Sequence, residues 1–233
     1  FFPNATTYVL SGLEPVGQVP ELSQLSRRAI GSELAGLRSS LNSVLSFSFF
    51  ITKDMKHQLR AGRVNGTLPI LYVFLARSGK TIEDVSFLSL DSEGVEHPAS
   101  EKPARNAPQG VKIVFSGSDG VKRTLYYFST DLSNSAANNS GFLKFCEKLG
   151  AGDALIKSAS YLLHSGSFTT VRDFILRHAT TLVQDDSGVP VQHFANADWD
   201  LHPYGRYLGP ISIFPGRYQK SLARLFRNAP SID

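Results

Sequence analysis

Asp198, Asp200 and His202 alternate along the chain with the spacing D-x-D-x-H. In an extended segment, side chains point alternately to opposite faces, so these three would project to the same face. Two carboxylates and one imidazole on one face can bind a divalent cation and leave open positions for water. The competing interpretation is a solvated loop, because Asp is a frequent turn residue and Pro203 breaks regular structure.

Asp185 and Asp186 are adjacent and precede Ser187 and Gly188. Adjacent carboxylates repel, and burial would raise the pKa of one of them unless a cation or hydrogen-bond donors compensate. Calcium suits such a pair, because it takes hard oxygen ligands from loops that contain glycine. The alternative is a turn in which one aspartate accepts a backbone hydrogen bond and Gly188 takes a positive φ.

His193 lies in residues 189–194, whose composition predicts a short strand. A histidine at the end of a strand beside an acidic loop is a candidate metal ligand or general base, and a structural histidine at a sheet edge is the alternative. The predicted catalytic group is His193, His202 and Asp200. The predicted metal site, for calcium or zinc, consists of Asp185, Asp186, Asp198, Asp200 and His202.

All these candidates belong to an acidic segment of a basic chain. Residues 178–205 contain four aspartates and no Lys or Arg, whereas the 233-residue chain has a net charge of +4. Carboxylates and imidazoles without neighbouring cations favour a metal site or an acid–base site. Arg206, which follows the segment, could pair with it or bind an anionic substrate.

Motifs of other enzyme classes are absent from the sequence. Residues 164–167 combine His with Ser, but no G-x-S-x-G motif occurs, and helix capping explains the glycine and serines of this stretch. Residues 76–81 end in Gly-Lys-Thr without the earlier glycine of a phosphate-binding loop. Cys146 is the single cysteine, which excludes an intramolecular disulfide and favours a small buried side chain.

Hydrophobic periodicity predicts an α/β fold with a mixed sheet, flanking helices and one β-hairpin, in two or three layers. The hairpin is expected in residues 111–129, where two β-prone runs flank a Gly-Ser-Asp-Gly turn. The apolar run 68–76 fits either a buried strand or a short buried helix. Without a repeat or a strong linker, residues 1–233 are expected to form a single α/β domain. A strand is also predicted at 8–10, and helices are predicted at 22–46, 141–149, 153–164, 169–183 and 218–227.

Composition constrains the partners of the chain. Its 24 Lys and Arg are scattered and nearly balanced by 20 Asp and Glu, so no nucleic-acid partner is predicted. No run of 18 or more apolar residues occurs, so no integral membrane segment is predicted. The first residue is Phe1 rather than Met, which indicates a removed leader or a fragment that lacks an N-terminal portion.

Four phrases of the sequence are distinctive: FFPNATTYVLSGLEPVG at 1–17, KSASYLLH at 157–164, QDDSGVP at 184–190 and YGRYLGPISIF at 204–214. Together they resemble an uncharacterised family of exported bacterial proteins. The resemblance implies a bacterial source and a periplasmic or secreted location. No activity, fold or catalytic residue comes with it.

The acidic segment leads to two function hypotheses. The first is an exported hydrolase that activates water, with or without a divalent cation, towards an ester, lactone or phosphoester of a small-molecule substrate. The second is a non-catalytic periplasmic or surface binding domain in which the acidic tract is a solvent loop or a structural calcium site. A third hypothesis, independent of this segment, is an interaction module that uses exposed Phe and Tyr. Convergence of the candidate side chains beside a cleft would favour the first hypothesis, and their dispersal would favour the second.

Overall fold

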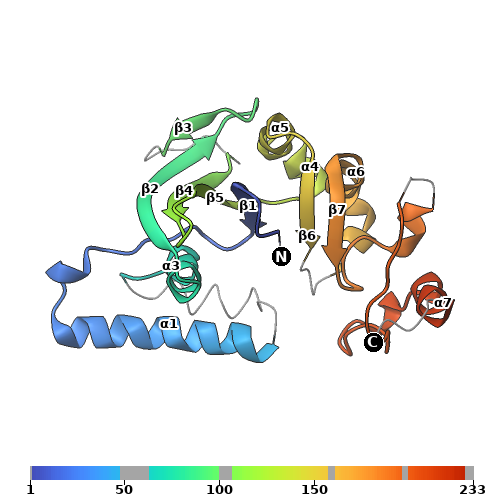
Figure 1. The fold of residues 1–233 in the computed structure, drawn as a ribbon, viewed down its shortest axis with the longest axis horizontal. Helices are drawn as coiled ribbons and strands as arrows, with labels where there is room; N and C mark the ends of the chain where they lie inside the picture. Colours follow the sequence, from blue (N-terminus) through green and yellow to red (C-terminus); the bar gives the residue numbers. More distant parts are fainter. Residues whose placement is uncertain (1, 48–62, 100–106, 157–160, 196–198, 229–233) are drawn as a thin grey trace. The chain divides into compact units, whose positions relative to one another are not determined.

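The structure is a computed structural model and describes residues 2–47, 63–99, 107–156, 161–195 and 199–228 (Figure 1). The chain divides into two compact units. Unit 1 comprises Phe1–Asp131 and Asn139–Lys148, and unit 2 comprises Leu132–Asn138 and Leu149–Asp233. Folding as one domain stays a prediction. Within the described ranges, no helix combines the length and the apolar character needed to cross a membrane.

Unit 1 is built on a five-stranded mixed sheet with the strand order β1-β5-β4-β2-β3. β1 pairs with β5 in parallel, and the other neighbours are antiparallel. The predicted hairpin is confirmed as β4 and β5, whose last register pair joins Ser116 to Lys122. Asp119 closes its turn by accepting a hydrogen bond from the backbone N–H of Val121. The strands are β1 (Thr7–Gly12), β2 (Thr81–Leu90), β3 (Glu96–Pro98), β4 (Gln109–Ser116) and β5 (Lys122–Ser129).

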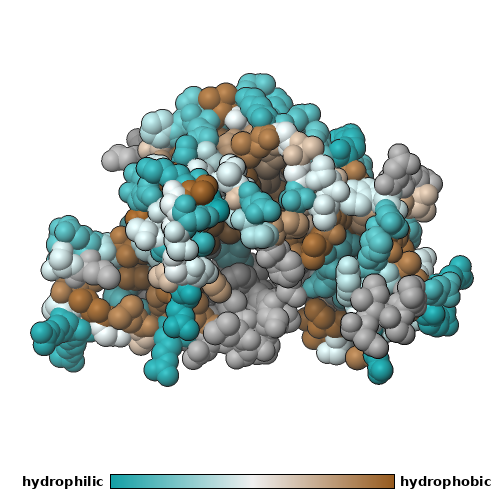
Figure 2. Space-filling model, viewed as in Figure 1, coloured by the Kyte–Doolittle hydropathy of each residue, from teal (hydrophilic) through white to brown (hydrophobic). Residues whose placement is uncertain are grey.

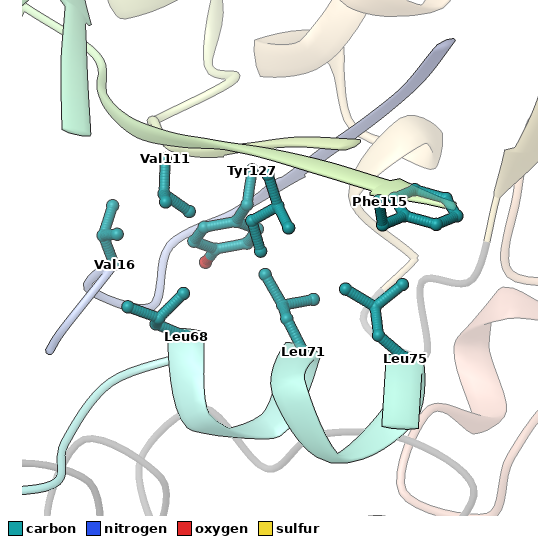
Figure 3. Close-up of a cluster of buried hydrophobic side chains, with 8 residues drawn as sticks. Val16, Leu68, Leu71, Leu75, Val111, Phe115 and Tyr127 are labelled. Atoms are coloured by element: carbon teal, nitrogen blue, oxygen red, sulfur yellow. The ribbon is translucent and has the colours of Figure 1, made fainter. Parts of the chain in front are cut away.

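The apolar run at 68–76 forms helix α3 (Leu68–Arg77), so of the two predicted alternatives the helix is correct. Pro69 lies in the first turn of the helix, where a missing N–H costs nothing. Gly79 has a positive φ, and Lys80 N–H bonds the carbonyl of Leu75, which ends the helix. In Figure 3 the side chains of α3 point at one face of the sheet. The buried cluster there consists of Val16, Leu68, Leu71, Leu75, Val111, Ile113, Phe115 and Tyr127.

The opposite face of the sheet is covered by α5 (Phe142–Lys148). Side chains alternate along β5, so Tyr127 faces α3 while Tyr126 and Phe128 face α5. The ring of Phe145 lies edge-on to Tyr126 at 5.1 Å and to Phe128 at 5.2 Å. Phe128 is fully buried, and burial of such a ring contributes about 1.5–3 kcal/mol.

Helix α1 (Arg27–Phe47) packs outside α3, because its Leu37 and Leu41 contact the buried Ile70. Most of the α1 residues from 27 to 35 are exposed, and Figure 2 shows mixed hydrophobic and hydrophilic side chains in the region of α1 and the segment before it (lower left). With α3 on one face of the sheet and α5 on the other, unit 1 has the predicted α/β class with helices flanking a mixed sheet. A short 3-10 turn, η1 (Leu22–Gln24), precedes α1.

Two glycines fix the loop that leads to α3. Gly17 and Gly66 both have positive φ, and their Cα atoms lie back to back beside the backbone bridge between Gln18 and Asn65. A Cβ on Gly17 would collide with the carbonyl of Asn65. Only glycine fits this close approach of two backbones.

Unit 2 contains a second, two-stranded parallel sheet of β6 (Gly152–Ile156) and β7 (Ala179–Gln184). The helix predicted at 153–164 is wrong, because residues 153–156 pair with β7 instead. The helix predicted at 169–183 ends early for the same reason: α6 covers Thr169–His178, and the β-branched run after it joins the sheet. The remaining elements are α4 (Asn134–Ala137), α7 (Lys220–Asn228) and the 3-10 turns η2 (Leu162–His164), η3 (Gly166–Phe168), η4 (Val191–Phe194) and η5 (Pro215–Arg217).

Asn134 from α4 fixes the start of α6. Its side-chain oxygen accepts from the backbone N–H of Thr170 at 2.9 Å, and its nitrogen donates to Gly166 O and Thr169 Oγ1. These bonds satisfy backbone groups that a helix start leaves without partners. The segment 132–138 is thereby tied to unit 2.

Candidate functional site

Asp200 and His202 lie on an exposed segment of unit 2. His202 Nε2 is 3.2 Å from Asp200 Oδ2, and the two side chains are 61% and 90% exposed. Asp198, the third member of the D-x-D-x-H pattern, lies outside the described residues. The structure thus brings Asp200 and His202 together as a solvent-exposed pair.

His193 lies in the 3-10 turn η4 (Val191–Phe194), so the strand predicted for residues 189–194 is wrong. Pro190 precedes the turn, and the backbone N–H of His193 bonds the carbonyl of Pro190, which curls the chain instead of extending it. Burial lowers the pKa of His193, with a further contribution from the charge of Arg172. Its imidazole is therefore neutral at pH 7.

The turn at Asp185 has the geometry of the alternative interpretation. Asp185 Oδ1 accepts from the backbone N–H of Ser187 at 2.9 Å and also from the hydroxyl of Ser187, which forms an Asx-turn. Gln184 braces the same loop, because its amide both donates to and accepts from the backbone of Val189 at 2.8 Å. Gly188 does not take the positive φ that was expected; it is required because a Cβ would collide with the side chain of Gln184.

Asp186 points in another direction and links several segments. Its Oδ2 accepts a hydrogen bond of 2.8 Å from the hydroxyl of Tyr161, which also accepts one from the backbone N–H of Ile211 at 3.0 Å. Burial raises the pKa of the Tyr161 hydroxyl to about 12, so it stays protonated and donates. Burial also raises the pKa of the Asp186 carboxyl above its usual range.

The backbone carbonyl of Asp186 is a second junction. Gln219 Nε2 donates to it at 2.8 Å, and His164 Nε2 lies 3.2 Å from it. The other amide atom of Gln219 accepts from the backbone N–H of Val191 at 3.1 Å. Tyr207 completes the network, since its hydroxyl accepts from the backbone N–H of Gln219 at 3.1 Å.

A pocket of about 280 Å³ opens beside this network. His164 forms part of its wall, and burial lowers the pKa of His164, an effect that the charge of Arg217 reinforces. The lining contains two cationic side chains and no carboxylate. The lining residues are His164, Pro190, Gln192, Gly216, Arg217, Tyr218, Gln219, Lys220 and Ser221.

The predicted metal ligands divide between two places. Asp185 and Asp186 belong to the braced loop, and Asp200 and His202 form the exposed pair. Within the described ranges, no three His, Cys, Asp or Glu side chains are grouped closely enough to hold a metal ion. Because Asp198 is outside those ranges, binding of calcium or zinc stays a prediction.

The pocket residues were missed by reasoning from the sequence. The sequence pattern predicts His164 at the end of a helix, and it gives Arg217 and Lys220 no special role among the scattered charges. One signal was present: residues 201–228 contain five Lys or Arg and no Asp or Glu. This basic segment overlaps the end of the acidic one, has its first cation at Arg206, and supplies most of the pocket wall.

Comparison of the chain with models of protein families, with curated proteins and with solved structures finds no match. The resemblance to exported bacterial proteins therefore stays a prediction.

Proposed function

We propose that unit 2 binds a small anionic molecule in the pocket between His164 and the start of α7. The observation that carries this proposal is the charge of the lining, which includes Arg217 and Lys220 and no carboxylate. An unscreened pair of cations in a concave site favours a carboxylate or phosphate group. Arg217 offers a bidentate fork for such a group, and Lys220 offers a mobile point charge.

The first turn of α7 supports the same ligand class. Gln219, Lys220 and Ser221 line the pocket where this nine-residue helix begins. The N-terminus of a helix presents free backbone N–H groups and the positive end of its dipole, both of which stabilise an anion. The first turn of α7 contains no acidic residue that would occupy these groups.

The pocket is preformed by the hydrogen bonds behind it. Both ends of the Gln219 amide are bound to backbone groups, and its own N–H is bound to Tyr207. A wall held in this way loses little conformational entropy when a ligand binds. The volume of about 280 Å³ lies at the small end of ligand sites, which favours a ligand of few heavy atoms.

The test is titration of the protein with inorganic phosphate, acetate and citrate at constant ionic strength, followed by thermal melting and by chemical shifts of the His164 ring. We expect saturable binding of at least one anion, and loss of that binding in R217Q/K220Q. A matched control is R28Q/R77Q, which removes two exposed cations of unit 1. Equal, non-saturable responses in both double variants would contradict the proposal.

Hydrolysis in the same pocket is the second candidate, and the position of His164 favours it. A neutral imidazole that donates from Nε2 to the carbonyl of Asp186 has Nδ1 free to accept a proton. His164 would take a proton from water as the water oxygen bonds the carbonyl carbon or phosphorus of the substrate. Arg217 and Lys220 would stabilise the negative charge that develops, and the proton would return to the departing alcohol.

Assays with p-nitrophenyl acetate and p-nitrophenyl phosphate test this candidate. We expect turnover to fall by about 10²–10⁴-fold in H164Q, as for loss of a general base. H202Q changes an exposed histidine away from the pocket lining and serves as the matched control. Addition of EDTA, calcium or zinc in the same assays tests the predicted cation dependence. Turnover that H164Q leaves unchanged would assign any activity to another group.

A further inference from the structure

The most exposed large hydrophobic side chains of the described residues all lie in residues 204–218 of unit 2. Leu208 is 93% exposed, Tyr204 72%, Ile213 69% and Tyr218 54%, while every other exposed large hydrophobic is below half. Single exposed apolar residues are ordinary on a protein surface. Four within one short segment mark a surface that meets something apolar.

The same part of the chain is strongly basic. Residues 201–228 contain five Lys or Arg and no Asp or Glu, and all five are exposed. Within the described ranges, none of the five forms an ion pair with an acidic side chain. This charge exceeds the +4 of the whole chain. The five residues are Arg206, Arg217, Lys220, Arg224 and Arg227.

Local packing of the neighbouring aromatic rings keeps Leu208 exposed to solvent. Tyr207 stacks on Tyr218 at 5.6 Å between ring centroids and lies 6.2 Å from Phe226 of α7. Leu208, the neighbour of Tyr207, is left in solvent. The conformation of this segment is therefore set by its own aromatic contacts.

Ile213 is presented in the same way by a turn that is anchored on both sides. The backbone N–H of Ile211 bonds the hydroxyl of Tyr161, and the ring of Phe214 packs on the ring of Tyr161 at 5.2 Å. A further hydrogen bond of 2.7 Å joins Phe214 N–H to the carbonyl of Ile211. The turn thus directs Ile213 away from the buried Tyr161.

We propose that residues 204–227 form a surface that binds anionic phospholipid bilayers. Leu208 and Ile213 enter the boundary between headgroups and acyl chains, and the five cations contact the lipid phosphates. Stable peripheral binding needs both an apolar and an electrostatic contribution, and this segment supplies both. The aliphatic side chains favour lipid over nucleic acid, which would be bound by cations and aromatic rings. This surface shares Arg217 and Lys220 with the pocket but does not depend on the pocket binding a ligand.

Sedimentation with vesicles of phosphatidylcholine alone, or with phosphatidylglycerol in part of its place, tests the proposal. We expect binding to the anionic vesicles only, and weaker binding as salt is raised. L208S/I213S is expected to weaken the partition by at least about tenfold, since each substitution removes an apolar side chain from the boundary. R206Q/R224Q/R227Q, which leaves the pocket lining intact, is expected to weaken it by about a hundredfold.

Two matched variants in unit 1 separate these effects from a general loss of hydrophobicity or charge. L13S/V121S changes two exposed apolar side chains, and R28Q/R38Q/R77Q changes three exposed cations. Both are expected to bind vesicles as the unaltered chain does. The fluorescence of Trp199, which packs edge-on against Phe194 at 5.5 Å, reports that unit 2 is folded in each variant.

Three results would overturn the proposal. One is equal binding to neutral and anionic vesicles, or no binding to either. Another is vesicle binding that L208S/I213S leaves intact. If the chain then also binds a DNA or RNA oligonucleotide, the surface would be assigned to nucleic acid. The third is self-association that L208S/I213S abolishes in a chain that binds no vesicles. Failure of phosphate titration with intact vesicle binding would reject the pocket alone.

Discussion

Replacement of Tyr161 by phenylalanine removes the hydroxyl that joins three segments of unit 2. The side chain is 1% exposed, donates to Asp186 at 2.8 Å and accepts from the backbone N–H of Ile211 at 3.0 Å. Phenylalanine keeps the ring and its contacts with His164 and Phe214. The substitution therefore removes these two hydrogen bonds with little change in packing.

The loss of stability in Y161F follows from the two groups that lose their partner, the Asp186 carboxylate and the Ile211 N–H. A hydrogen bond to a charged group contributes about 1.5–3 kcal/mol, and a buried N–H without an acceptor costs about 1–3 kcal/mol. Asp186 and Ile211 are both half-buried, so water replaces part of what each group loses and both contributions fall to the lower end of these ranges. We expect Y161F to lower the free energy of unfolding of unit 2 by about 2–4 kcal/mol.

Urea denaturation followed by Trp199 fluorescence measures this loss, because Trp199 lies in unit 2. Y204F removes the hydroxyl of a tyrosine that is 72% exposed and serves as the control, with an expected change below about 0.5 kcal/mol. A double-mutant cycle with D186N should give a coupling of at least about 0.5 kcal/mol. A loss in Y161F no larger than in Y204F, or no coupling, would refute the assigned bond.

Three further predictions concern other residues. Burial raises the folded-state pKa of Asp186, so its contribution to stability is complete below the unfolded pKa and is lost as pH rises through the folded pKa. D186N should therefore gain stability relative to the unaltered chain as pH rises above the unfolded pKa of the carboxyl, and urea titrations at a series of pH values measure this gain. G17A should lower the free energy of unfolding by more than about 2 kcal/mol, because Gly17 has a positive φ and a Cβ there would collide with the Asn65 carbonyl. G31A, on the open side of α1, should raise the free energy of unfolding by about 0.5–1 kcal/mol. Equal effects of the two substitutions would contradict the close approach of the Gly17 and Gly66 backbones. D200N should change the melting temperature little in EDTA, and should abolish any shift that calcium or zinc produces if Asp200 is a ligand; a shift that survives in D200N would remove Asp200 from the metal site.

The elements of unit 1 were predictable where the signal is local. The hairpin of β4 and β5 follows from β-prone residues on both sides of a glycine turn, and α5 follows from its aromatic periodicity. The run at 68–76 was ambiguous because it is hydrophobic nearly throughout, so no period distinguishes a buried strand from a buried helix. Pro69 in the first turn and Gly79 after the end of the run carry the information that selects the helix.

The errors in unit 2 have a different cause. β6 and β7 pair in parallel although 22 residues, 157–178, separate them in the sequence, and parallel strands need such long connections. Neither strand has a local turn that marks its partner. From the sequence alone, residues 153–156 therefore fit the helical period of the residues after them. Only their pairing with β7 identifies them as a strand.

The sequence shows where charged residues cluster along the chain, but it does not show which of them lie together in the candidate site. Counting charges located an acidic segment, yet Asp185 satisfies its carboxylate with Ser187, and Asp200 is 90% exposed. The groups that build the pocket instead meet at one backbone carbonyl, that of Asp186, which no side-chain pattern marks. His164 reaches it from 22 positions away in the sequence and Gln219 from 33. Since a carbonyl that is partly removed from water bonds donors wherever the fold supplies them, such a site becomes visible only when the hydrogen bonds of the loop are known. The acidic turn then serves to position His164 and the basic start of α7 around a pocket of opposite charge.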